Sequence, residues 1–118
     1  MTPEFERSLN QYAELIVKVG LNLQPGQRLL IRGPIEAAPL ARLVAARAYD
    51  MGGRLVETIL NDPQMLLTRY RHAPRDSFSE HSDWWWRAGL EYVEAGGALL
   101  SIAGVEPYLL KGIDPELI

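Results

Sequence analysis

Two histidines and three acidic residues lie close together in the most polar part of the chain, and residues of these types can hold a metal ion. The two histidines are nine positions apart, and the set comprises His72, Asp76, Glu80, His81 and Asp83. A tight metal site usually takes ligands four apart on a helix or two apart on a strand, and this segment offers neither arrangement convincingly. We therefore interpret Ala73–Asp83 as a polar, irregular and solvated segment. Weak ion contact at Glu80-His81 and Asp83 is the alternative.

A second candidate is the loop Gly33-Pro34-Ile35-Glu36, which follows a predicted strand and opens a predicted helix. Ligands of α/β sheets usually bind beyond the carboxyl ends of the strands, and a helix N-terminus can hold a phosphate. Here Pro34 and Pro39 lack amide donors, and Glu36 puts a negative charge where the phosphate would lie. Neither a G-x-G-x-x-G nor a G-x-x-x-x-G-K pattern is present, so the sequence disfavours a nucleotide site.

The run Trp84-Trp85-Trp86 places three large rings about 100° apart around a helix, so they cannot all enter one core. Trp86 shares a helical face with Leu90 and Val93. We therefore expect Trp86 to pack inward and Trp85 to point toward solvent or a partner. Two interpretations stay open: the rings pack under the preceding loop, or they contact another domain or subunit, where exposed aromatics concentrate.

Glu57 is the one carboxylate inside a predicted strand. We interpret it as a structural carboxylate paired with Arg28 or Arg54, because burying an unpaired charge is costly. The spacing reveals no Ser/His/Asp arrangement and no pair of catalytic carboxylates. We therefore name no catalytic, cofactor-binding or metal-ligating residue in this chain.

The composition limits the classes of function. The 118 residues allow one domain, 1–118, and their net charge of −3 provides no basic surface for nucleic acid or an anionic membrane. The absence of cysteine excludes a disulfide scaffold, a thiolate zinc site and a cysteine nucleophile. The sequence has no apolar run of membrane-spanning length, and its polar, acidic N-terminus is unlike a signal peptide. We expect a cytoplasmic protein.

The elements that position these residues are organised around the stretch from Leu23 to Arg54, which predicts a strand and a helix and leads into a second strand. Short apolar runs predict strands at Leu29–Arg32, Leu55–Leu60 and Ala98–Ile102. Apolar positions at helical spacing, together with N-terminal caps, predict the helices. These are a helix capped by Thr2 and stopped at Gly20, one from Glu36 stopped by Gly52-Gly53, a short one at Gln64–Arg71 capped by Asp62-Pro63, and one at Trp84–Ala95 capped by Asp83.

This order predicts an α/β fold, a three-layer Rossmann- or flavodoxin-like unit with a short parallel sheet. Right-handed crossovers favour strand order 2-1-3 with helices on both faces, so Leu29, Leu30 and Ile31 should be nearly inaccessible. The first helix is indicated by apolar residues at helical spacing: Phe5, Leu9, Tyr12, Ala13, Ile16 and Val19. A turn or short helix is expected at Pro107–Leu110. Asp114-Pro115-Glu116 then opens a helix just before the last residue, so we expect a unit that is incomplete at its C-terminus.

The segment Tyr12–Gly53 contains K-x-G-L-N-x-Q-P-G-Q followed by R-x-P-x-E-A-A-P-L. With His72-Ala73-Pro74 and the tail Leu109–Ile118, it resembles the N-terminal portion of the thermophilic-type metallo-aminopeptidases, peptidase family M29. The resemblance covers nearly the whole chain. Gly33 stands where many members carry a small residue such as alanine, and the tryptophan run departs from the usual Trp-Leu or Trp-Met pattern.

The resemblance implies a two-domain cytoplasmic exopeptidase that removes N-terminal residues from peptides with two divalent metal ions, zinc, cobalt or magnesium, and that is typically a homodimer. It also implies that the metal ligands and the catalytic tyrosine lie C-terminal to this chain, so no residue here inherits them. We therefore expect a non-catalytic N-terminal domain that is inactive alone. The alternative is a flavodoxin-like binding or interaction module that works by itself.

Overall fold

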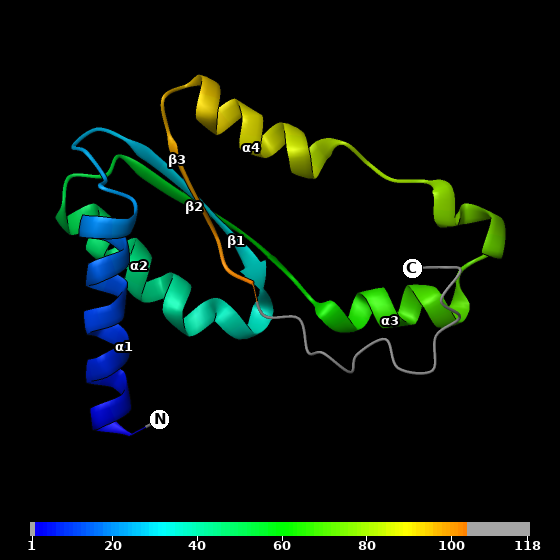
Figure 1. Ribbon diagram of the computed structural model, residues 1–118, viewed down its shortest axis with the longest axis horizontal. Coiled ribbons are helices and arrows are strands. Elements are labelled where there is room, and N and C mark those ends of the chain that lie inside the picture. Colours follow the sequence, from blue (N-terminus) through cyan, green and yellow to red (C-terminus); the bar gives the residue numbers. More distant parts are fainter. Residues whose placement is uncertain (1, 104–118) are drawn as a thin grey trace.

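A computed structural model describes residues 2–103, which form one open parallel sheet with helices on both faces (Figure 1). The strands are β1 (Arg28–Pro34), β2 (Leu55–Asn61) and β3 (Ala98–Ser101). Their order is β2-β1-β3, with Ile31 of β1 paired between Thr58 and Leu100. The predicted fold class and the central position of the first strand are confirmed. The expectations at Pro107–Leu110 and Asp114-Pro115-Glu116 lie outside the described residues.

The helices occur in the predicted order along the chain. They are α1 (Pro3–Leu15), which continues into the π-helical turn η1 (Ile16–Gly20), the 3₁₀ turn η2 (Ile35–Ala37), α2 (Ala38–Asp50), α3 (Pro63–His72), the 3₁₀ helix η3 (Arg75–Ser79) and α4 (Trp84–Glu94). The segment expected to be irregular therefore contains a short helix. Gly52, with φ of +90°, ends α2 as predicted, because glycine adopts this left-handed conformation without steric cost.

Two of the three predicted N-terminal caps form. The Thr2 hydroxyl accepts a hydrogen bond from the Phe5 amide at 3.1 Å, and the Asp62 carboxylate accepts one from the Gln64 amide at 2.9 Å. Asp83 occupies the cap position of α4 but makes no capping hydrogen bond. Its carboxylate lies 3.5 Å from the Arg87 guanidinium instead, so Asp83 is the N-cap residue as predicted, but the capping hydrogen bond is absent.

The hydrophobic core lies between the sheet and the layer made by α1 and α2. Leu29, Leu30 and Ile31 are at most 2% exposed, as expected for a strand with neighbours on both edges. The side chains of β1 alternate between the two faces, and Leu29 and Ile31 enter this core. The other members of the core are Ala13, Val17, Leu23, Ala41, Val44 and Ala48.

The apolar residues whose spacing predicts α1 differ in burial. Phe5, Tyr12 and Val19 are exposed, whereas Ala13 and Val17 are the buried residues of this helix and its π-helical extension. Small side chains four positions apart let α1 lie close against α2. The other two large apolar residues of the pattern are half-buried.

The described chain is more extended than a compact domain. Its radius of gyration is 16.9 Å, compared with about 13 Å for a compact domain of roughly 100 residues. Figure 1 shows the reason: α3 and η3 project beyond the end of β2, and the chain then returns to α4 over the sheet. The face of the sheet under α4 is correspondingly less covered than the face under α1 and α2.

Candidate functional site

The carboxyl ends of all three strands surround a cavity of about 390 Å³. This edge is where parallel α/β sheets usually bind ligands. The strand order reverses at β1, because β2 lies on one side of it and β3 on the other. Ligands of such sheets usually bind at this point of reversal. The cavity is lined by strand ends and by the first turns of α3 and α4: Arg32, Gly33, Pro34, Asn61, Pro63, Trp85, Ser101, Ile102 and Ala103. No histidine or carboxylate is among these residues.

Gly33 and Pro34 belong to β1 rather than to a loop, which corrects the sequence-based expectation. They pair with Leu60 and Asn61 of β2, and both are buried. Proline is tolerated at the end of a strand because its missing amide interrupts no further ladder. Glu36, one turn later, is exposed at the start of α2.

Arg32 is the charged residue of this cavity, and no role was predicted for it from the sequence. Its Nη1 donates a hydrogen bond to the Trp85 carbonyl at 3.0 Å, and its guanidinium carbon lies 5.5 Å from the centre of the Trp85 ring. A cation over an indole face is attracted by the negative face of the ring. A single cue in the sequence could have indicated this residue: it is a charged side chain at the end of an apolar strand.

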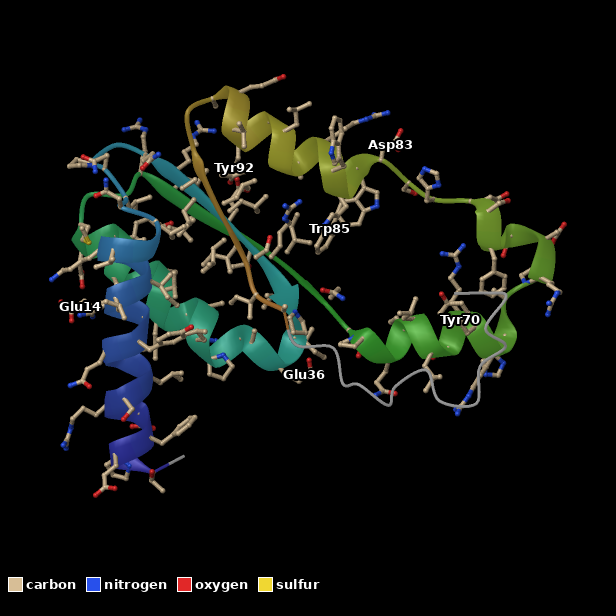
Figure 2. All side chains as sticks on the ribbon, viewed as in Figure 1. Glu14, Glu36, Tyr70, Asp83, Trp85 and Tyr92 are labelled. Atoms are coloured by element: carbon tan, nitrogen blue, oxygen red, sulfur yellow. The ribbon has the colours of Figure 1, made fainter. Side chains whose placement is uncertain are left out.

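The predicted orientation of the tryptophans is wrong. Trp85 is half-buried and faces the sheet (Figure 2), whereas Trp86 is 67% and Trp84 58% exposed. A methyl group at Gly89 would come 3.0 Å from the Arg32 guanidinium, so the absence of a side chain there lets α4 approach the sheet. Trp85 and Gly89 therefore define the inner face of α4, and the stripe of Trp86 and its helical neighbours turns outward.

A second cavity, of about 280 Å³, lies between α4 and the first part of β2. Here the Tyr92 hydroxyl donates a hydrogen bond to Glu57 Oε1, so the partner of Glu57 is Tyr92 rather than the predicted Arg28 or Arg54. Burial raises the pKa of Tyr92, and the hydrogen bond to Glu57 and its negative charge raise it further. A protonated tyrosine that holds a carboxylate is a link between helix and strand, which agrees with a structural role for Glu57.

The two histidines are exposed and lie on different elements, His72 at the end of α3 and His81 between η3 and α4. Arg69 occupies the space near His81, where its Nη2 donates to the carbonyl oxygens of Ser77 and Glu80 at 2.9 and 3.1 Å. A fixed positive charge disfavours a metal cation at this position. Within residues 2–103, no group of three or more histidine, cysteine, aspartate or glutamate side chains is placed to hold a metal.

Fold and site together define an α/β domain in which one arginine, and no histidine or carboxylate, lines the cavity at the strand ends. The model of the thermophilic metalloprotease family M29 matches residues 5–118, and the chain belongs to this family. Among the described residues, no helix has the length and apolar character needed to cross a membrane.

The curated relatives are bacterial aminopeptidases. The chain is 46% identical over 114 residues to Aminopeptidase 2 of Geobacillus stearothermophilus, which covers 97% of this chain and 28% of that protein. It is 35% identical to Aminopeptidase T of Thermus thermophilus, over 95% of this chain and 28% of that protein. The solved structure of wild-type AmpT from Thermus thermophilus matches with a TM-score of 0.89, at 35% identity and the same coverage. The chain thus corresponds to an N-terminal portion of these proteins.

Proposed function

We propose that this chain is the N-terminal, non-catalytic domain of a metal-dependent aminopeptidase that removes N-terminal amino acids from peptides. The observation that carries the proposal is the M29 match over residues 5–118, in a chain that spans 28% of its aminopeptidase relatives. In this proposal residues 1–118 form the N-terminal α/β domain, or part of it, and contain no catalytic or metal-binding residue.

The positions of the histidine and carboxylate side chains among the described residues support a non-catalytic role for this domain. A site with two divalent ions about 3.5–4 Å apart needs several carboxylates and imidazoles held at fixed positions. Residues 2–103 bring no three such groups together, and the cavity at the strand ends has none in its lining. The described residues therefore do not fit a two-metal centre, and we assign zinc, cobalt or magnesium to the remainder of the polypeptide.

The domain then acts as a scaffold, and its strand-end cavity with Arg32 and Trp85 forms part of the wall of a substrate cavity. An arginine beside an indole ring can bind the carbonyl and side-chain groups of a peptide. It supplies no acid, base or nucleophile for cleaving the peptide. We further propose that the complete protein is a cytoplasmic homodimer. The lack of a basic surface, at a net charge of −3, supports peptide substrates rather than nucleic acid.

Metal titration and an aminopeptidase assay test the proposal. The 118-residue chain should bind zinc, cobalt and magnesium no better than exposed surface groups do, and it should release no amino acid from leucyl substrates. The complete gene product should release amino acids and lose this activity on chelation. Stoichiometric submicromolar metal binding by the 118-residue chain, or turnover that chelation abolishes, would show a catalytic site within these residues.

The matched control replaces both histidines, as His72→Ala with His81→Ala. Weak zinc binding through exposed imidazoles disappears in this variant, whereas the activity of the complete protein stays unchanged. A gene whose reading frame stops after Ile118, together with an intact mass equal to that of the 118-residue chain, would favour the flavodoxin-like module that works alone.

A further inference from the structure

The guanidinium of Arg32 carries a half-buried charge that the described residues do not neutralise. Its Nη1 donates to the Trp85 carbonyl at 3.0 Å, and its carbon lies 5.5 Å from the centre of the Trp85 ring. Both of these partners are neutral. Its Nε is buried and has no hydrogen-bond acceptor, and no carboxylate of residues 2–103 forms an ion pair with it. Because arginine is always protonated in proteins, an anion beside this side chain is favoured.

A second arginine of the domain is compensated in the usual way. Arg47 of α2 also has a buried Nε without an acceptor, but its Nη2 lies 3.2 Å from the Asp50 carboxylate. Burying an unpaired charge is costly, so buried charges are generally paired. The carboxylate that β2 carries, Glu57, does not serve Arg32: it accepts from Tyr92 and lines a different cavity. The charge of Arg32 is therefore free to meet a ligand.

The cavity that this guanidinium lines combines polar and apolar walls. It has a volume of about 390 Å³ and lies at the carboxyl ends of the strands, where ligands of parallel sheets bind. Asn61 and Ser101 are the uncharged polar residues of its lining, and the side chains of both residue types can donate hydrogen bonds to an anion. Pro34 and Ile102 contribute apolar surface. Such a cavity fits a group that is anionic at one end and apolar beside it.

Gly89 determines how closely α4 approaches the guanidinium. A methyl group at this position would lie 3.0 Å from Nη1 and 3.3 Å from Nη2 of Arg32, so any side chain would displace the guanidinium or lift the helix. Without one, the helix comes close enough for the Trp85 carbonyl to accept from Nη1. An arginine held by a carbonyl and a ring is oriented before a ligand arrives, which reduces the entropy lost on binding.

The composition of the lining distinguishes a peptide from a free amino acid. Both have an α-carboxylate that an arginine can bind. In a free amino acid an ammonium group is attached to the same carbon and would enter the cavity with it, and the described lining contains no carboxylate to pair with this second charge. In a peptide the nitrogen on that carbon is an uncharged amide. The lining therefore favours the carboxyl end of a peptide.

We propose that the cavity beside Arg32 binds the C-terminal carboxylate of a peptide. Arg32 pairs with the carboxylate, Asn61 and Ser101 donate hydrogen bonds to it, and the apolar wall at Ile102 contacts the last side chain of the peptide. The inference deepens the proposed function, on which it rests for the peptide as ligand. It makes Arg32 a residue that selects peptides with a free carboxyl end over those that end in an amide.

Binding of a blocked dipeptide to the complete gene product tests the proposal without turnover. N-acetyl-leucyl-alanine has a free carboxylate but no amino group, so an aminopeptidase cannot release a residue from it, and its C-terminal amide differs in lacking the charge. Both are titrated by calorimetry after divalent ions have been removed by chelation and dialysis, so that no metal ion holds the carboxylate. The acid should bind at least about tenfold more tightly than the amide, because the hydrogen bonds to it are charge-assisted.

The result separates this inference from the proposed function. Equal binding of acid and amide, or no measurable binding of the acid, would overturn the inference. A protein that prefers the acid but has no aminopeptidase activity contradicts the proposed function alone. An active protein that does not distinguish the two dipeptides contradicts this inference alone.

Substitutions on β1 and α4 locate the carboxylate. Arg32→Met removes the charge and should weaken binding of the acid at least about tenfold while leaving the amide unchanged. The matched control Arg28→Met removes an arginine from the same strand that lines the other cavity, and it should change neither ligand. Gly89→Ala keeps the charge but displaces the guanidinium, so it should also weaken the acid. Equal weakening by Arg28→Met and Arg32→Met would show an effect of net charge and overturn the assignment. Should Arg32→Met fail to fold, the comparison of acid and amide in the unmodified protein still decides.

Discussion

Leu29 and Leu30 are neighbours on β1 and equally buried, yet truncating them should have different costs. Leu29 enters the core under α1 and α2, whereas Leu30 faces α4 and lines the cavity of about 280 Å³ beside Tyr92. The two substitutions, Leu29→Ala and Leu30→Ala, remove the same atoms. They therefore compare how tightly the two faces of one sheet are packed.

The expected loss in the free energy of unfolding has two contributions. One is the transfer free energy of the three carbons that each substitution removes from the protein interior, and the other is the cavity that remains. Removing three buried carbons costs about 2.4 kcal/mol in either variant. A cavity of about 80 Å³ that stays empty adds about 2 kcal/mol. This second contribution applies to Leu29, whose neighbours belong to packed helices. Beside Leu30 a cavity already exists, which water or the side chains of α4 can fill, so little is added. We expect about 4.5 kcal/mol for Leu29→Ala and about 2.5 kcal/mol for Leu30→Ala.

Equilibrium urea unfolding followed by circular dichroism measures both free energies in the 118-residue chain. Leu55→Ala, at a strand position that is 36% exposed, is the control and should cost less than about 1 kcal/mol. Equal costs for Leu29→Ala and Leu30→Ala, or a larger cost for Leu30→Ala, would refute the packing difference between the two faces. In the complete protein the difference should shrink if a further helix covers the α4 face.

Three further predictions concern contacts outside the core. Tyr92→Phe should lower the free energy of unfolding by about 1 kcal/mol, because it removes one hydrogen bond to Glu57. The raised pKa of Tyr92 keeps its proton in the folded state, so native stability should fall as pH rises above about 10, the tyrosine pKa of the unfolded chain. Urea unfolding at pH 8 and 11 should show a smaller fall in the variant than in the unmodified protein. Asp62→Ala removes the acceptor of the Gln64 amide and should cost about 1 kcal/mol, seen as faster amide exchange in α3 with β1 unchanged. Arg69→Ala removes the donors that hold η3 to α3, so limited proteolysis should cleave the segment 73–83 faster, and Arg69→Lys, which keeps the charge without the planar fork, should be cleaved at an intermediate rate.

The strands, their order and most helix boundaries could be predicted from the sequence because their causes are local. The apolar run Leu29–Ile31 requires cover on both faces, and a glycine such as Gly52 ends a helix wherever the chain needs a positive φ. Right-handed crossovers then leave few arrangements for three parallel strands. The carboxyl end of β1 was less predictable, since β1 continues through Pro34 only because β2 runs beside it to Asn61.

The candidate site was harder to predict because its contacts join residues far apart in the chain. Arg32 and Trp85 are 53 positions apart, and Tyr92 and Glu57 are 35 apart. Nothing in the local pattern of either strand indicates its partner on α4. For Glu57 the sequence predicted a structural partner but not its identity, and for Arg32 it predicted no role.

The wrong prediction for the tryptophans has a physical cause. An apolar stripe in a helix indicates that something covers it, and the nearest predicted candidate was the sheet. In the structure the sheet takes the other side of α4, because Gly89 allows close approach and Arg32 attracts the Trp85 ring and carbonyl. The stripe that begins at Trp86 therefore remains exposed.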